Sequence, residues 1–254
     1  MSIQIENLSF GYKESLILNE ISLEFQRGQM YGLLGRNGTG KTTLIKSMLG
    51  LLPLKQGKIR VNDRVLSAIS TRELAQQIAY VPQSEDLVYG IKVIELVVMG
   101  RNPYLNLFDM PGEREYALAQ EALENLGISH LAQKSYAEIS GGERQLVLIA
   151  RALVQDTQFI IMDEPISNLD IKNQHEVLHK IQKIAENYQI GVILSIHDPN
   201  LALRYCHQSV MLKEGKVIFA GKTQDIINQD SLHTVYQMPF EVMKGEQGLY
   251  FCGA

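Results

Sequence analysis

A glycine-rich segment near residue 35 has the composition and spacing of a phosphate-binding loop. Residues 35–42 fit the pattern G-x-x-x-x-G-K-[ST] in full, between an apolar strand and a helix. Glycines let such a loop curl until successive backbone N–H groups converge on phosphate oxygens, and the helix that follows points its positive end at the same anion. We expect Lys41 to contact the β- and γ-phosphates of a nucleotide and the hydroxyl of Thr42 to bind Mg²⁺. The expected nucleotide-binding residues here are Gly35, Arg36, Asn37, Gly38, Thr39, Gly40, Lys41, Thr42 and Thr43.

Two adjacent carboxylates follow a second apolar segment. Residues 159–162 predict a buried strand that ends in Asp163 and Glu164. A carboxylate at a strand tip beside such a loop can hold Mg²⁺ directly or through water, the role expected of Asp163. Glu164 is expected to point toward the γ-phosphate and to orient the attacking water. The alternative is that the pair only caps the next helix.

A second candidate anion site begins at Ser140. Ser140, Gly141 and Gly142 precede a helix and present a hydroxyl and backbone N–H groups at its N-terminus, with Glu143 next in the chain. Two phosphate-binding helix ends in one chain, about a hundred residues apart, suggest a site shared between two chains. The alternative is an N-cap serine followed by a flexible glycine pair.

Other residues suggest zinc chemistry only weakly. His175 and His179 match the pattern H-E-x-x-H and would share one helix face, the geometry that zinc needs. No third ligand is indicated, and a solvated helix face is the favoured interpretation. The two cysteines, Cys206 and Cys252, lie far apart and predict neither a disulfide nor a zinc framework.

The elements that must position these residues alternate between strand and helix, which predicts an α/β core with a helical insertion. The predicted strands are residues 3–10, 17–25, 29–34, 58–61, 78–81, 158–162, 191–196, 210–213 and 216–220. The predicted helices are residues 43–49, 113–126, 142–154, 171–187 and 199–205, and the pattern between residues 91 and 153 is helical. The net charge of −4 and the lack of a Lys/Arg-rich run argue against a nucleic-acid partner. No apolar run is long enough to cross a bilayer.

The ordered set of motifs resembles the ATP-binding cassette (ABC) ATPases over essentially the whole chain. The set consists of GRNGTGKTT at 35–43, Gln83, ISGGERQ at 139–145, FIIMDEP at 159–165, NLD at 168–170 and HD at 197–198. The resemblance implies a single ABC ATPase domain over 1–254. Its P-loop core would span 1–87 and 155–221, with an N-terminal antiparallel β subdomain. An α-helical subdomain would cover about 88–154, and a C-terminal extension about 222–254.

The resemblance also implies roles for single residues. Gln83 would join the magnesium site to the transporter interface, and His197 would contact the γ-phosphate in its own subunit. Residues 140–143 would contact the γ-phosphate held by a second copy, Asp170 would cross the dimer interface, and Tyr12 would stack on adenine. The catalytic set is then Glu164, His197 and Gln83, and the metal set is Thr42, Gln83 and Asp163. The chain departs from the usual pattern at Ile139, Glu143 and Ile166, none of which removes a phosphate ligand.

Segments 93–103, 169–174 and 197–202 resemble those of ATPases that serve iron-chelate, haem and cobalamin importers. The implied cofactors are ATP and Mg²⁺. The implied partners are a second copy of the chain, two polytopic permease subunits and, indirectly, a substrate-binding protein. The expected location is the cytoplasmic face of the inner membrane, as a peripheral subunit. A molybdate importer and a soluble ABC ATPase uncoupled from transport are the alternatives.

Overall fold

The computed structural model describes residues 1–12, 15–83, 90–106, 108–245 and 248–253. Its contacts divide the chain into two units. The first unit contains residues 1–69 and 191–254, and the second contains residues 70–190.

An antiparallel sheet opens the first unit, with strand order β2-β1-β4-β5. Four side chains of β1 form its core: Ile3, Ile5, Leu8 and Phe10 are almost fully buried, with a register shift between Ile5 and Leu8. Ile3 lies opposite Val61 on β4, which places apolar residues of both strands at one level. The strands are β1 (Ser2–Tyr12), β2 (Ser15–Gln26), β4 (Gln56–Val61) and β5 (Arg64–Val65), and the 3₁₀ turn η1 (Leu66–Ala68) follows.

The second group of strands in this unit runs in the order β10-β9-β3-β8. Strand β3 (Met30–Leu34) pairs in parallel with β8 (Gly191–Ser195) and with β9 (Gln208–Lys213), and every residue of β3 is buried. Strand β10 (Lys216–Lys222) closes a hairpin with β9. Because the carboxyl ends of parallel strands meet at one edge, the loops after β3 and β8 emerge side by side. Helix α1 (Lys41–Met48) starts from the first of these loops.

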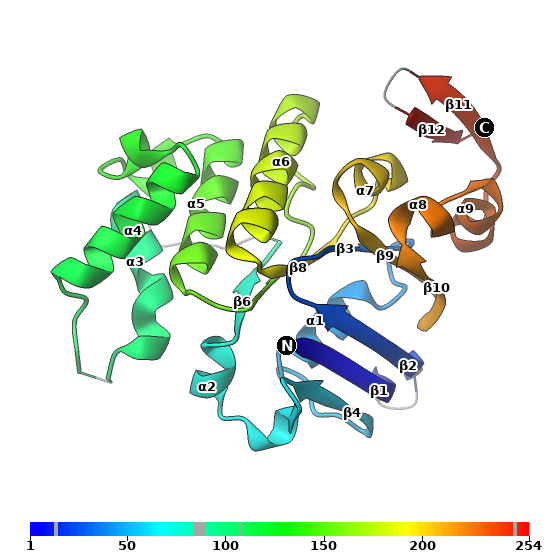
Figure 1. Ribbon diagram of the computed structural model, residues 1–254, viewed down its shortest axis with the longest axis horizontal. Helices are drawn as coiled ribbons and strands as arrows, with labels where there is room; N and C mark the ends of the chain where they lie inside the picture. Colours follow the sequence, from blue (N-terminus) through cyan, green and yellow to red (C-terminus); the bar gives the residue numbers. More distant parts are fainter. Residues whose placement is uncertain (13–14, 84–89, 107, 246–247, 254) are drawn as a thin grey trace. The chain divides into compact units, whose positions relative to one another are not determined.

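Helices and a hairpin complete the first unit (Figure 1). They are α7 (Pro199–Tyr205), α8 (Thr223–Ile226), α9 (Gln229–Tyr236) and the hairpin of β11 (Phe240–Gly245) with β12 (Gly248–Gly253). The side chain of Asn200 fastens the hairpin: its amide nitrogen donates to the carbonyl of Phe251 at 3.0 Å, and its oxygen accepts from the amide of Phe251 at 2.8 Å.

The second unit combines a parallel strand pair with a group of helices. Strand β6 (Ile78–Val81) pairs with β7 (Phe159–Met162), which is fully buried. Helix α5 contacts α3, α4 and α6, as Figure 1 shows. The helices are α2 (Thr71–Ala75), α3 (Val93–Val98), α4 (Glu113–Asn125), α5 (Gly141–Val154) and α6 (Ile171–Tyr188). The 3₁₀ turns are η2 (Met99–Tyr104), η3 (Ser129–Leu131) and η4 (Tyr136–Glu138).

Turn η2 packs directly on the C-terminal end of α5. A Cβ atom at Gly100 would lie 2.2 Å from the carbonyl oxygen of Arg151, so only glycine permits this approach. The buried guanidinium of Arg101 donates to the carbonyl of Val154 at 3.0 Å, where a cation suits the negative end of the helix. These contacts fix the helix that carries residues 140–143 at its other end.

The predicted elements are confirmed apart from shifts of one or two residues at most of their ends. Helix α1 starts at Lys41 rather than 43, because the amide of Leu44 already donates to the carbonyl of Gly40 at 2.8 Å. The helical character of segment 91–153 is confirmed for its described residues, whereas positions 88, 89 and 107 of the expected subdomain lie outside them. Within the described ranges, no helix is both long and apolar enough to cross a membrane.

Candidate active site

The loop after β3 has the backbone conformation of an anion cradle. Gly35, Gly38 and Gly40 all have positive φ, at 146°, 80° and 102°. A Cβ atom at Gly35 would lie 2.5 Å from the carbonyl oxygen of Leu212, and one at Gly40 would lie 2.7 Å from Leu18. Helix α1 begins with no side-chain cap and no acidic residue in its first turn. Its N-terminal N–H groups and dipole are therefore available to an external anion.

The side chain of Lys41 lies inside the loop and contacts its backbone carbonyls. Its ammonium donates to the carbonyls of Gly35 at 2.7 Å and Arg36 at 3.2 Å, and the side chain is buried. The hydroxyl of Thr39 also donates to the carbonyl of Arg36, at 2.9 Å. The cation is thus held inside the loop, and its contact with the β- and γ-phosphates stays a prediction.

The end of α9 lies against the same loop. The guanidinium of Arg36 donates to the side-chain oxygen of Gln237 at 2.9 Å. The hydroxyl of Tyr236 donates to the carbonyl of His197 at 3.1 Å, in the segment that follows β8. A cavity of about 180 Å³ lies here, lined by Arg36, Asn37, Gly38, Thr39, Lys213, Glu214, Val235 and Gln237. The structure therefore brings the loop and the His197 segment together through residues that the sequence motifs did not indicate.

In the second unit, Asp163 and Glu164 stand at the carboxyl end of β7. Asp163 is buried, its amide donates to the carbonyl of Val81 at 2.9 Å, and its charge helps burial to raise the pKa of Tyr80 to about 12. Glu164 has a positive φ of 47°, which turns its side chain out of the strand direction. The amide of Gln83 donates to the carboxylate of Glu164 at 2.8 Å. Two of the expected catalytic residues are therefore in direct contact.

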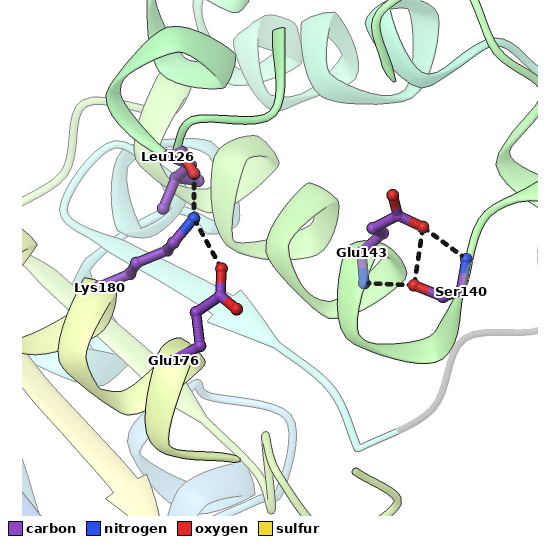
Figure 2. Close-up of polar contacts among 5 residues, drawn as sticks. All are labelled: Leu126, Ser140, Glu143, Glu176 and Lys180. Atoms are coloured by element: carbon purple, nitrogen blue, oxygen red, sulfur yellow. Dashed lines mark hydrogen bonds and ion pairs between the residues drawn. The ribbon is translucent and has the colours of Figure 1, made fainter. Parts of the chain in front are cut away.

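The N-terminus of α5 is a closed capping box (Figure 2). The amide and the hydroxyl of Ser140 donate to the carboxylate of Glu143 at 2.8 Å and 2.7 Å, and the hydroxyl accepts from the Glu143 amide at 3.4 Å. These hydrogen bonds lower the pKa of the Glu143 carboxyl. Ser140 is therefore an N-cap, as the alternative interpretation expects, and its contact with an anion stays a prediction.

Helix α6 contacts both the N-terminal end of α5 and the C-terminal end of α4. A Cβ atom at Gly142 would lie 3.0 Å from the side chain of Asn173, which in turn donates to Asp170 at 2.9 Å. Figure 2 shows Lys180 of α6 donating to the carbonyl of Leu126 at the end of α4 and pairing with Glu176 at 3.3 Å. A cavity of about 210 Å³ lies between these elements, lined by Gln83, Tyr136, Gly141, Arg144, Gln145, Leu148, Glu164, Pro165, Ser167, Asn168 and Leu169.

Other predicted residues occupy positions that leave their roles as predictions. Tyr12 is 52 % exposed and stacks edge-on against Phe10, with ring centroids 5.0 Å apart. Thr42 and His197 are exposed. His175 and His179 both lie on α6, and in the described part of the chain no group of three or more His, Cys, Asp or Glu side chains could hold a metal ion.

Comparison with known protein families shows to which family the chain belongs. A family model described as ABC transporter matches residues 18–167. The chain belongs to the ABC transporter ATP-binding family. It is an ATPase subunit: it binds ATP and hydrolyses it, and ATP-binding subunits of ABC importers work together with membrane permease subunits.

Relatives of this ABC chain match it over nearly its full length. It is 36 % identical over 244 residues to an iron chelatin transport ATP-binding protein of Helicobacter pylori, covering 96 % of each chain. It is also 36 % identical over 251 residues to the hemin import ATP-binding protein of Bordetella pertussis, covering 96 % of this chain and 95 % of the relative. The solved structure of a metal-chelate type ABC transporter, in an inward-facing conformation, matches with a TM-score of 0.88 and 29 % identity, covering 100 % of this chain and 97 % of the other.

Proposed function

We propose that this chain is the ATPase subunit of an importer that takes up a metal-chelate type substrate, such as an iron chelate, haem or cobalamin. The observation that carries this proposal is the full-length match to iron chelatin and hemin import proteins. The chain would bind two polytopic permease subunits at the cytoplasmic face of the inner membrane, and a substrate-binding protein would deliver the cargo. Its core would comprise residues 1–87 and 155–221, with the helical subdomain at 88–154.

The proposed hydrolytic chemistry uses the phosphate-binding loop, His197 and the two carboxylates that follow β7. Lys41 and the N–H groups of the loop would bind the β- and γ-phosphates, while Glu164 would orient the attacking water and His197 would contact the γ-phosphate. Thr42, Gln83 and Asp163 offer a hydroxyl, an amide and a carboxylate. These hard oxygen donors fit Mg²⁺, which would neutralise charge on the β- and γ-phosphates. The contact between Gln83 and Glu164 supports the roles of these two side chains, because it holds an expected Mg²⁺ ligand beside the expected catalytic carboxylate.

The proposed active form is a dimer that encloses two ATP molecules. The phosphates bound by the loop of one copy would meet Ser140, Gly141, Gly142 and Glu143 of the other. Asp170 would cross the interface, and Tyr12 would stack on adenine. The uncapped α1 helix and the serine-capped α5 helix support this arrangement, because each offers N-terminal N–H groups to an anion. Closure on ATP and reopening after hydrolysis would then drive the permease subunits.

Replacing the proposed catalytic carboxylate tests this mechanism. Glu164→Gln keeps the size of the side chain but removes the charge that polarises water. We expect hydrolysis to fall by about 10²-fold or more. ATP should still bind and hold a long-lived dimer, measured by size exclusion with light scattering. Glu124→Gln, an exposed glutamate on α4, is the matched control and should hydrolyse ATP normally. Hydrolysis by Glu164→Gln at the wild-type rate would remove Glu164 from the mechanism.

The cargo is tested separately, in vesicles that contain the chain and the permease with which it co-purifies. Uptake of a labelled ferric chelate or haem that depends on ATP, and that Glu164→Gln abolishes, is the expected result. Uptake of molybdate alone would overturn the proposed substrate class while leaving the ATPase assignment intact. Failure to co-purify with any polytopic membrane protein would favour an ATPase that is not coupled to transport.

A further inference from the structure

The C-terminal segment, defined here as residues 228–253, touches the nucleotide site through the end of helix α9. Its residue Tyr236 makes a hydrogen bond to a separate part of the chain: the hydroxyl donates to the carbonyl of His197 at 3.1 Å. His197 follows strand β8, which pairs with the strand β3 that leads into the phosphate-binding loop. The next residue after Tyr236 contacts that loop. The end of helix α9 therefore joins the segment of His197 to the loop that holds Lys41.

The segment around Tyr236 is well anchored. Leu232 and Val235 of α9 are fully buried, and the side chain of Asn228 caps the helix by accepting from the Ser231 amide at 2.9 Å. The ring of Tyr236 packs edge-on against Phe240, with centroids 5.8 Å apart. A hydroxyl carried on a fixed helix end holds its hydrogen-bond partners in place more firmly than one on an open loop.

The next residue strengthens the link. Gln237 adopts a left-handed conformation, with φ 58°, and accepts a hydrogen bond from Arg36 at 2.9 Å. Consecutive residues at the end of α9 thus contact the two segments: Tyr236 donates to His197, and Gln237 accepts from Arg36 of the loop. Burial, helped by the charge of Asp198, raises the pKa of Tyr236 well above its usual range, so the hydroxyl stays protonated and able to donate.

We propose that Tyr236 is a positioning residue for hydrolysis: it fixes the backbone of His197 relative to the phosphate-binding loop, so that the imidazole meets the γ-phosphate held by Lys41. The inference rests on the proposed role of His197. It gives the C-terminal segment a function in catalysis that lies outside the motifs of the loop, the strand tip and the signature. Tyr236 does not contact phosphate; its effect passes through His197.

The test compares steady-state ATP hydrolysis by full-length variants. Tyr236→Phe retains the ring and loses the hydrogen bond to the carbonyl of His197, so we expect kcat to fall about three- to tenfold while KM for ATP changes by less than about twofold. Tyr31→Phe is the matched control. Tyr31 is a buried tyrosine of β3 whose hydroxyl accepts from the amide of Gln26 at 2.8 Å, away from the loop. It should keep its kcat even if its melting temperature falls as much as that of Tyr236→Phe.

A double variant separates positioning from general stability. If Tyr236 acts through His197, then Tyr236→Phe should lower kcat no further in a His197→Ala background. An additive loss, or equal kcat values for Tyr236→Phe and Tyr31→Phe, would overturn the proposal. If His197→Ala alone hydrolysed ATP at the wild-type rate, the role assigned to His197 would fail instead. The two failures are therefore distinguishable.

Discussion

The capping box at the N-terminus of α5 provides the most discriminating prediction. Ser140→Ala removes the hydroxyl that accepts from the Glu143 amide at 3.4 Å and donates to its carboxylate at 2.7 Å. Loss of a serine N-cap costs about 1 kcal/mol of stability. For a chain of this size that corresponds to a melting temperature roughly 2–4 °C lower. The same hydroxyl is the proposed contact to the γ-phosphate of a second copy, so its loss should also weaken the ATP-bound dimer.

The chain contains a second capping box that separates these two effects. At the start of α2, the amide and the hydroxyl of Ser70 donate to Glu73 at 2.9 Å and 2.8 Å, and the Glu73 amide returns a bond at 3.2 Å. Ser70→Ala therefore removes the same chemical group from the same kind of cap. It should lower the melting temperature by a similar amount and leave the ATP-bound dimer unchanged, because α2 has no role in the proposed site.

Light scattering across a range of protein concentrations, in the Glu164→Gln background with ATP, measures the dimer dissociation constant. The symmetric dimer would make this contact twice, once at each ATP, and a hydrogen bond to a charged group contributes about 1.5–3 kcal/mol, so Ser140→Ala should weaken the dimer by roughly 10²- to 10⁴-fold. Equal dissociation constants for Ser140→Ala and Ser70→Ala would refute the phosphate contact. An unchanged melting temperature for Ser140→Ala would refute the importance of the cap.

Two further predictions concern charged side chains of the site. Lys41→Ala removes the buried ammonium and should weaken ATP binding by about 1.5–3 kcal/mol in a fluorescence titration, whereas the exposed Lys46→Ala on the same helix should bind normally; equal affinities would contradict the assignment. Hydrogen bonds from Ser140 lower the pKa of Glu143, and a carboxyl with a lowered pKa stabilises the fold above its unfolded pKa and loses that contribution as the pH falls. The stability advantage of wild type over Glu143→Gln should therefore be present at about pH 7 and shrink below the ordinary carboxyl pKa of 4.5, measured by urea unfolding; an advantage that grows on acidification would contradict the capping role.

The sequence predicted the region around the phosphate-binding loop well, because several local signals agree there. The short apolar run 30–34, bounded by turn residues, favours a buried strand, and the motif itself calls for positive φ at its glycines and for a helix directly after the loop. The pairing of Asp163 and Glu164 at a strand tip followed from the same reasoning. The contact between Gln83 and Glu164 could not be predicted, since it depends on the left-handed backbone at Glu164, a residue type without a preference for it.

The C-terminal segment was missed because its local signals are weak. Helix α9 is only eight residues long, and only Ser231, Leu232 and Val235 among them are buried, too few for a clear helical period. Asn228, three residues before Ser231, was a usable capping signal. The hairpin of β11 and β12 exposes most of its residues, so it lacks the alternation typical of a strand packed on a core. Its order comes from tertiary contacts such as the one between Asn200 and Phe251.

The packing of Gly142 against Asn173 has a practical consequence for engineering. A designer who wishes to exchange the signature between related transporters would ordinarily graft residues 139–145 as one cassette. Here the space next to the Cα atom of Gly142 is already filled by the side chain of Asn173, in the first turn of helix α6. The same side chain donates a hydrogen bond to Asp170. A graft that ends at residue 145 would therefore place the signature of one parent against the Asn173 side chain of the other. Functional chimeras of this chain should include residues 170–173 with the signature, so that both halves of the contact come from one parent.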